Sequence, residues 1–426
     1  MRYLPQTENA RKEMLKSVGV TSVDALYRDI PEAAFVDGLV DLPKHQGELQ
    51  VERDLSAMAE KNMAASQVPF FLGAGVYNHH IPASVDYIIQ RSEFLTAYTP
   101  YQPEIAQGTL QVIFEYQTFI AKMTGQEIAN ASLYDGSTAV AEAALMAMRI
   151  TKRNKIAIGT EIHPEYRKVL GSYMSNYDDR EVFDGEPDDT TACVIVQSPD
   201  FFGNPHKYDE WRKKCDETGA LLVVVINEIV SLGMLPPPVE ADIVCGEAQS
   251  IGLPMGFGGP HLGFFACKEK YLRQMPGRLC GMTEDADGRR GFVLTLSTRE
   301  QHIRREKATS NICTNQGLCA LAFTVHMSLL GEDGFKKLAR LNHDAACRLA
   351  DALDALDGVS VVNQGFFNEF VVELPKASAL VVEDLTTCGI IGGYALEGNK
   401  LLVAATEMTT QDQIEEFVET LSEILL

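Results

Sequence analysis

The sequence predicts an α/β fold with a mainly parallel central sheet. Short, fully apolar runs such as ACVIVQ and ALLVVVIN alternate with helical stretches such as YDEWRKKCDETG. Strands that lack polar alternation are typical of a sheet covered by helices on both faces. The chain has 426 residues, of which 46% are hydrophobic and 23% charged, and this is enough for a large domain and a smaller one.

The expected elements divide into three segments along the chain. Residues 1–60 show helical patterns interrupted by turns, and we expect an N-terminal helical arm there. Residues 61–335 should form the large α/β domain. Residues 336–426 alternate strands and helices, from VSVVN and EFVVEL to QDQIEEFVETLSEILL, and should form a small C-terminal α/β domain.

Within the large segment the elements are expected in the following order. GTLQVIFEYQTFIAKMTG has apolar residues at helical spacing, and TAVAEAALMAMRITKR is typical of a buried, alanine-rich helix. The strands are expected at KIAIGT, ACVIVQ, ALLVVVIN, DIVCG, GFFAC and FVLTLS. After Ala308 we expect a long helix that leads past Gly331 into a further helix.

Composition excludes several classes of function. The formal net charge of −22 argues against nucleic acid as a partner, because it repels phosphate backbones. No apolar run is long enough for a membrane span, and the start MRYLPQTENARKEM has no apolar signal core, so we expect a cytoplasmic protein. Nine scattered cysteines without C-x-x-C spacing predict neither a disulfide framework nor a metal site.

Two loops rich in tyrosine form the first candidate site. They are FLGAGVYNHHIPA and YTPYQPEIAQG, in which glycine and proline expose the backbone. Their side chains either converge on a ligand or pack against a partner subunit, where tyrosine is also favoured. The candidate residues are Tyr77, Asn78, Tyr98, Thr99, Tyr101, Gln102 and Glu104.

A Gly-Ser-Thr turn that opens a helix is the second candidate site. The helix N-terminus and the hydroxyls of Ser137 and Thr138 are suited to a phosphate. Either hydroxyl is equally suited to be the N-cap of the helix.

Acidic residues at two strand ends are the third candidate site. Asp200 and Glu228 follow the apolar runs, at the edge of an open sheet where ligands bind. An acid there can pair with a pyridinium nitrogen, and His163, after another strand, can stack on the ring. The alternatives are a turn aspartate, a salt-bridged glutamate and a histidine with an ordinary hydrogen-bonded role.

The fourth candidate site combines a glycine-rich loop, GFGGPHLG, with a cationic segment further along the chain. Such a segment in an acidic chain is typical either of an anion or acidic-surface site or of a structural ion-pair cluster. Its basic residues are Arg299, His302, Arg304, Arg305 and Lys307.

Several of these strings resemble the glycine decarboxylase P-protein of the glycine cleavage system. They are YTPYQPE, GSTAVAEA, GFGGPHLG, MPGRLCG and TREQHIRREKATSNICT, and the resemblance covers nearly the whole chain. It implies the fold-type-I architecture of pyridoxal-phosphate (PLP) enzymes, an α2β2 assembly, and a reaction with glycine and the lipoyl arm of H-protein. The length of the chain is similar to that of the α subunit in the family's split, two-subunit form.

The resemblance also assigns roles to the candidate residues. Counting back from Pro260 places Gln249 at the position of the cofactor lysine, and an amide cannot form a Schiff base. The PLP would therefore belong to the partner β subunit, with no cofactor bound covalently by this chain. Ser137, Thr138, His163, Glu228 and Gln249 would line a vestigial pocket.

The two loops, above all residues 98–104, would then reach toward the partner's cofactor, and the cationic segment would form ion pairs or dock an acidic carrier. Two alternatives stay open. One is a purely structural pseudoenzyme that stabilises a PLP-bearing partner. The other is a self-sufficient PLP lyase or aminotransferase that uses Lys268 or Lys270.

Overall fold

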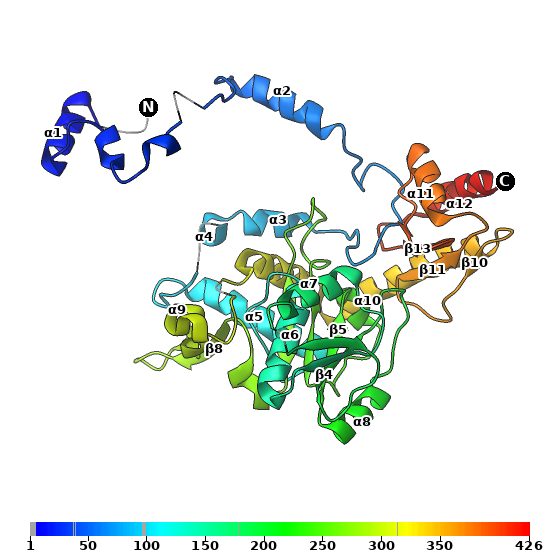
Figure 1. Ribbon diagram of the computed structural model, residues 1–426. Coiled ribbons are helices and arrows are strands. Elements are labelled where there is room, and N and C mark those ends of the chain that lie inside the picture. The colour runs from blue at the N-terminus through cyan, green and yellow to red at the C-terminus, as the bar shows by residue number, and fades with distance from the viewer. Residues whose placement is uncertain (1–5, 37, 39, 96–98, 178, 313) are drawn as a thin grey trace. The chain divides into compact units, whose positions relative to one another are not determined.

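A computed structural model describes residues 6–36, 38, 40–95, 99–177, 179–312 and 314–426. The chain divides into two compact units, Met1–Met63 and Ala64–Leu426 (Figure 1). The first contains two helices, α1 (Glu8–Val18) and α2 (Glu48–Ala59), where the sequence predicts helical patterns. None of its described residues is buried, and apolar side chains such as Leu55 and Met58 are exposed.

A seven-stranded sheet forms the centre of the second unit. Its order is β1 (Ile128–Ala129), β7 (Gly263–Cys267), β6 (Ile243–Glu247), β5 (Leu221–Ile226), β4 (Thr191–Gln197), β2 (Lys155–Ile158) and β3 (Glu181–Asp184). Strands β3, β2, β4, β5 and β6 are parallel, and β7 is antiparallel to both of its neighbours. The predicted mainly parallel sheet is confirmed.

Helices cover both faces of this sheet, as the fully apolar strands require. One face packs on α5 (Gln107–Thr124), α8 (Asp209–Thr218) and the first part of α10 (Gly317–Asp354). The other packs on α6 (Gly136–Thr151) and α7 (Pro164–Met174). Successive residues of a strand serve different faces, so Val223 belongs to the second core and Val224 to the first.

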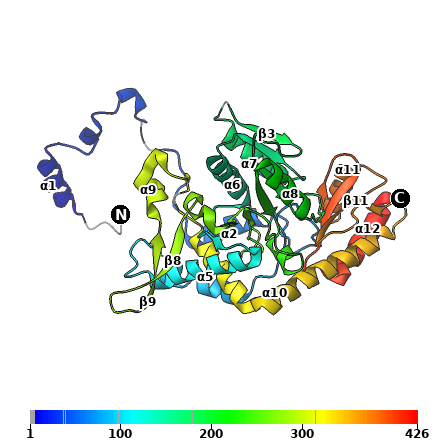
Figure 2. The same cartoon turned by 90° about the horizontal axis from the view of Figure 1, so that it is seen from below.

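A four-stranded antiparallel sheet follows at the C-terminal end. Its order is β10 (Ser360–Val361), β11 (Glu369–Glu373), β13 (Lys400–Ala404) and β12 (Tyr394–Ala395), and α11 (Ser378–Thr387) and α12 (Gln411–Leu425) pack on it. Figure 2 shows α10 running from the region of α5 to this sheet. Because α10 is interrupted only at Gly331, the boundary placed at residue 335 falls inside it and stays a prediction.

Two expectations about elements are wrong. The FVLTLS run lies in β9 (Arg290–Thr295), which pairs with β8 (Leu279–Glu284) in a separate hairpin and not in the main sheet. The long helix begins at Gly317 and not soon after Ala308; α9 (Gln301–Arg304) precedes Ala308, and the described residues between Ala308 and Gly317 are irregular chain. Two further short α-helices are α3 (Ala83–Ile89) and α4 (Ser92–Leu95). No helix among the described residues is long and apolar enough to span a bilayer.

Candidate functional site

Three of the candidate residues lie beyond the carboxyl ends of adjacent parallel strands. Asp200 follows β4, Glu228 follows β5 and Gln249 follows β6, and all three are buried. This edge of the sheet is the place where open α/β sheets bind ligands. The order of the strands in the sequence therefore predicted that these residues lie at one edge of the sheet, while their role in a site stays a prediction.

Hydrogen bonds hold both the side chain and the backbone of Gln249 in place. Its Nε2 donates to the carbonyl oxygen of Leu253 at 2.6 Å, and its backbone N–H donates to Oε1 of Glu247 at 3.0 Å. An amide in this position cannot form an imine with an aldehyde.

Glu247, which the sequence analysis did not single out, occupies the start of helix α6. Its Oε2 accepts the backbone N–H of Gly136 at 3.0 Å, and its Oε1 accepts the N–H of Leu262 at 2.7 Å, in addition to those of Ala248 and Gln249. Burial raises the pKa of the carboxyl, while His261 and the backbone amides oppose the rise. The amide at the helix N-terminus that would face a phosphate thus faces a carboxylate of the same chain.

Ser137 and Thr138 take part in capping helix α6, but neither is its N-cap. The N-cap is Asp135, whose Oδ1 accepts the N–H of Thr138 at 2.7 Å and the hydroxyl of Ser137 at 2.5 Å. Thr138 Oγ1 accepts the N–H of Asp135 in return, at 3.3 Å. The N-cap alternative was therefore wrong, since the carboxylate of Asp135, two positions before Ser137 and three before Thr138, accepts the free amide.

Glu228 pairs with a buried histidine. Its Oε2 lies 3.0 Å from Nε2 of His79, whose Nδ1 lies 2.9 Å from Oε2 of Glu407. Ser250 donates a further hydrogen bond to Glu228 at 3.0 Å. Burial opposes the charge on the imidazole, but the two carboxylates outweigh it and raise the pKa of His79 to about 10. The acid expected to face a pyridinium nitrogen instead faces an imidazolium.

His163 contacts the segment 74–79, which also contains His79. Its Nε2 donates to the carbonyl of Ala74 at 2.8 Å, and its Nδ1 accepts the N–H of Glu165 at 3.1 Å, so the ring is neutral. Burial lowers its pKa. Gly75 has a φ of +98°, and a Cβ there would lie 2.8 Å from the ring. The backbone of residues 74–75 therefore packs tightly against the imidazole.

Tyr77 also points into the molecule. Its hydroxyl donates to Oε2 of Glu369 in β11 at 2.8 Å, and burial raises the pKa of Glu369 to about 7. The carbonyl of Asn78 accepts the hydroxyl of Thr406 at 2.5 Å. Residues 74–79 are thus attached to Glu228 after β5 and to Glu369 in β11. Tyr77 lines a narrow pocket together with Asp200 and Glu228, with a volume of about 310 Å³ including its open mouth.

Asp200 is a turn aspartate. Its Oδ1 accepts the backbone N–H groups of Phe202 at 3.0 Å and Asn204 at 2.9 Å, and its Oδ2 lies 2.9 Å from Nε2 of His206. The structural alternative for this residue is confirmed, because both of its oxygens are used within residues 200–206.

The second tyrosine loop lies elsewhere, around Arg278. This buried guanidinium donates to Thr99 Oγ1 at 3.2 Å and to the Tyr101 hydroxyl at 2.6 Å, and its Nε donates to Glu300 at 3.1 Å. Tyr101 is about half exposed. Gln102 and Glu104 are exposed, and Tyr98 lies outside the described residues. The two loops grouped by sequence therefore belong to two different places.

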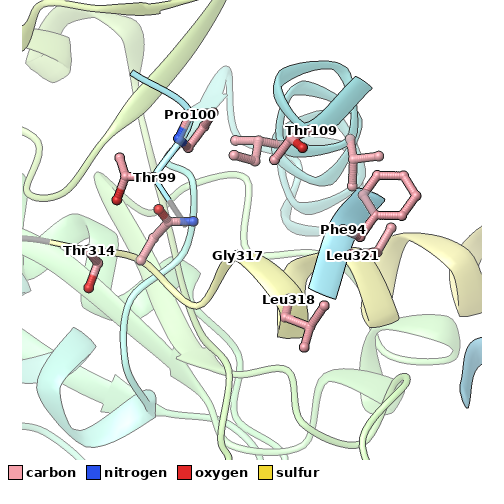
Figure 3. A pocket seen from close by; sticks show the side chains of 11 residues that line it. Phe94, Thr99, Pro100, Thr109, Thr314, Gly317, Leu318 and Leu321 are labelled. Atoms are coloured by element: carbon pink, nitrogen blue, oxygen red, sulfur yellow. The ribbon is translucent and has the colours of Figure 1, made fainter. Parts of the chain in front are cut away.

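Thr99 and Pro100 line a hollow beside the start of α10. Figure 3 shows Thr99 and Thr314 on one side of the view and Phe94, Leu318 and Leu321, which form the apolar side, on the other. The hollow encloses about 180 Å³. It combines hydroxyls with an apolar wall, which is the usual composition of a small-molecule site.

The cationic segment is divided between two roles. Arg299 is buried and donates to the carbonyls of Met275, Gly277 and Leu296, so it is structural. His302 lies 3.7 Å from Glu300 and contacts the Tyr101 ring edge-on. The remaining three cations, Arg304, Arg305 and Lys307, are exposed and form no ion pair within the described part of the chain.

The lysines considered as substitutes lie at the opposite edge of the sheet. Lys268 and Lys270 are 3.9 Å and 3.6 Å from Asp242, which immediately precedes β6. Gln249 and Glu228 lie beyond the other ends of β6 and β5. Neither lysine is therefore placed to share a ligand with Glu228.

Sequence reasoning missed four charged residues of these sites: Glu247, Glu369, Glu407 and Arg278. A charged residue at the end of the apolar run DIVCG marks Glu247 and could have been noticed. Glu369 and Glu407 meet residues 74–80 across about 290 to 330 positions of sequence, and no local pattern reports such a contact.

Comparison with known proteins agrees with this architecture. The family model described as glycine cleavage system P-protein matches residues 1–421. The probable glycine dehydrogenase (decarboxylating) subunit 1 of Maricaulis maris is 56% identical, with 100% of both chains covered. A solved glycine decarboxylase (P-protein) of the glycine cleavage system, in inhibitor-bound form, has a TM-score of 0.93 at 42% identity, again with 100% of both chains covered.

A more distant solved structure shows the fold alone. A C-DES variant with glycine covalently linked to its PLP cofactor has a TM-score of 0.61 at 13% identity, covering 84% of this chain and 97% of its own. The architecture is thus that of fold-type-I PLP enzymes, as the resemblance implied. On the match across residues 1–421 and the end-to-end identity with subunit 1 sequences, the chain belongs to the glycine cleavage system P-protein family.

Proposed function

We propose that this chain is the α subunit of a two-subunit P-protein and does not itself bind PLP. It supports decarboxylation of glycine, and transfer of the aminomethyl group to the lipoyl arm of H-protein, by a β subunit that carries the cofactor. The observation that carries the proposal is the pair formed by Gln249, where an amine is needed, and Glu247, whose carboxylate takes the amide of Gly136.

The residues at the strand ends do not fit PLP in three further respects. An anionic phosphate beside the Glu247 carboxylate would be repelled in a buried, low-dielectric place. Glu228 already neutralises His79. The segment that carries Gly75 packs against the His163 ring where a cofactor ring would stack. No step of the reaction is therefore assigned to this pocket.

The contribution of this chain to the reaction lies in the Tyr98–Glu104 loop. The hollow in Figure 3 has Thr99 and Pro100 on one wall and is open to a partner. It lies apart from the pocket at the strand ends that contains Glu228, hereafter the blocked pocket. Bound PLP on the β subunit would supply the electron sink for loss of CO2. The loop would position the glycine carboxylate and exclude water, with Arg278 holding Thr99 and Tyr101 in place.

Replacement of Tyr101 by phenylalanine separates participation from a purely structural role. In an intact complex, a lowered kcat supports participation, and unchanged turnover supports a structural pseudoenzyme that only stabilises its partner. Tyr394→Phe is the matched control, because Tyr394 is similarly exposed and lies in β12, outside this loop. The self-sufficient PLP enzyme is disfavoured by the position of Lys268 and Lys270 at the opposite edge of the sheet.

Partner docking is proposed for the exposed cations. Arg304, Arg305 and Lys307 have no partner charges within the described residues and suit an acidic carrier such as a lipoylated H-protein. The double variant R304A/R305A should bind H-protein more weakly than the wild type. Its affinity should also depend less on added salt than that of the wild type. Equal affinity of variant and wild type would remove the docking role.

The assembly itself is tested by reconstitution. We propose an α2β2 complex in the cytoplasm, in which glycine decarboxylation requires both subunits. Exchange of labelled CO2 with the glycine carboxyl should be absent with this chain alone and appear when the β subunit is added. Exchange by the purified chain alone would contradict the proposal.

A further inference from the structure

A large cavity lies between helices α6 and α7, on the second face of the sheet. It has a volume of about 1560 Å³ including its open mouth, and residues 308–311 form its third wall. It is lined by the C-terminal halves of the two helices. Those halves lie near the amino ends of the strands and away from the carboxyl ends, because a crossover helix runs antiparallel to its strands. The cavity is thus separate from the blocked pocket, and it shares no lining residue with the hollow of Figure 3.

Three cations and one buried acidic residue, Glu142, line this cavity. Arg149, Lys152 and Arg180 form no ion pair among the residues that the structure describes, although the chain has 59 acidic residues against 37 basic ones. The Arg180 guanidinium lies over the Tyr177 ring, 3.1 Å from its centroid. Burial lowers the pKa of Arg149, Glu142 opposes this effect, and Arg180 adds to it. Like charges gathered in this way favour an anion between them.

Two buried atoms at the floor of the cavity lack a hydrogen-bond partner. Arg149 donates through Nη2 to the carbonyl of Gln274 at 3.1 Å, but its Nε has no acceptor. Glu142, which is 1% exposed, accepts the Ser310 hydroxyl through Oε1 at 2.8 Å, and its Oε2 has no partner. Burial raises the pKa of this carboxyl, while the Ser310 hydroxyl and Arg149 oppose the rise. Buried polar atoms without partners are rare in folded proteins, and here both belong to one cavity wall.

We propose that this cavity is a binding site for a small oxyanion of the phosphate or carboxylate class, held by Arg149, Lys152 and Arg180. The guanidinium groups match the planar, two-oxygen geometry of such anions. Tyr173 and Ser172 on α7 add a ring and a hydroxyl to the wall. The overall charge of −22 does not prevent binding, because salt screens distant charges over about 8 Å at physiological ionic strength. This site is independent of the proposed role in glycine decarboxylation.

The test is isothermal titration of the full chain with inorganic phosphate and, separately, with citrate, at constant ionic strength. We expect at least one of the two anions to bind at one saturable site per chain. The anion that binds more tightly shows whether the site prefers phosphate or carboxylate. The variants K152Q and R180Q should each weaken binding about 3- to 10-fold, a change of about 0.7 to 1.4 kcal/mol.

Matched controls are K337Q and R340Q, which remove exposed cations of α10 that have no ion pair within the described residues. They should leave binding unchanged. Circular dichroism confirms that each variant is folded. Lys152 and Arg180 are chosen for replacement so that Arg149, whose Nε is buried, need not be altered. Absence of saturable binding up to about 10 mM of either anion, or equal weakening in the controls, would overturn the proposal.

Discussion

His79 is the residue whose replacement most directly tests how the segment 74–79 is held. It lies between Glu228 and Glu407, its side chain is 1% exposed, and both of its ring nitrogens are hydrogen-bonded to carboxylates. Replacing it with glutamine removes the positive charge and leaves two carboxylates facing each other in the interior. Breaking a buried ion pair by removing one partner costs about 3–5 kcal/mol. We therefore expect the free energy of unfolding of H79Q to fall by about that amount.

The adjacent His80 provides the control. Its side chain is exposed and only its backbone N–H contacts Glu407, at 2.7 Å, so H80Q should change stability by less than about 0.5 kcal/mol. Urea unfolding followed by far-ultraviolet circular dichroism measures both variants. Equal stabilities of H79Q and H80Q would refute the interpretation of His79 as a charged, stabilising link.

The difference in the free energy of unfolding between the wild type and H79Q depends on pH in a direction that the pKa shifts define. The folded pKa of His79 is raised to about 10 from 6.5, so its contribution is complete below pH 6.5 and is lost as the pH rises toward 10. The folded pKa of Glu407 is lowered to about 2 from 4.5 because His79 outweighs the effect of burial, so its contribution is complete above pH 4.5 and is lost toward pH 2. The stability difference between wild type and H79Q should be largest between these limits, near pH 4.5 to 6.5.

Three further predictions concern local structure. G75A should lower the free energy of unfolding by about 1–3 kcal/mol, measured by thermal unfolding, because the φ of Gly75 is +98° and an added Cβ would meet His163. G398A, at a residue with a positive φ but with open space around it, should lower it less. D135A removes the N-cap of α6 and should lose about 1 kcal/mol, and no loss would show that the cap is dispensable. Deletion of residues 1–63 should leave the melting temperature of the remainder unchanged, since none of the described residues of that unit is buried, but should weaken association with the β subunit in size-exclusion chromatography.

The fold was predictable wherever burial alone decides the structure. Fully apolar runs marked β4, β5 and β6, and the order of strands and helices placed Glu228 and Gln249 at one edge of the sheet. FVLTLS was assigned to the wrong sheet because an apolar run shows that a strand is buried but does not show against which partner.

The candidate site was predictable only in part, because its decisive contacts are non-local. Ser137 and Thr138 were considered as caps, while the carboxylate of Asp135 makes the bond. The identity of the group opposite Glu228 depends on His79 folding back over about 150 positions of sequence. Local spacing contains no information on such pairings, so the filled state of the pocket became visible only in three dimensions.

The most direct measurement is the intact mass of the purified chain after incubation with PLP and borohydride, with and without the β subunit. Reduction converts any imine into a stable adduct. With Gln249 at the lysine position and Glu247 on the amide of Gly136, the adduct should appear on the β subunit only. A stoichiometric adduct on this chain, mapped to Lys268 or Lys270, would contradict the account and indicate an independent PLP enzyme.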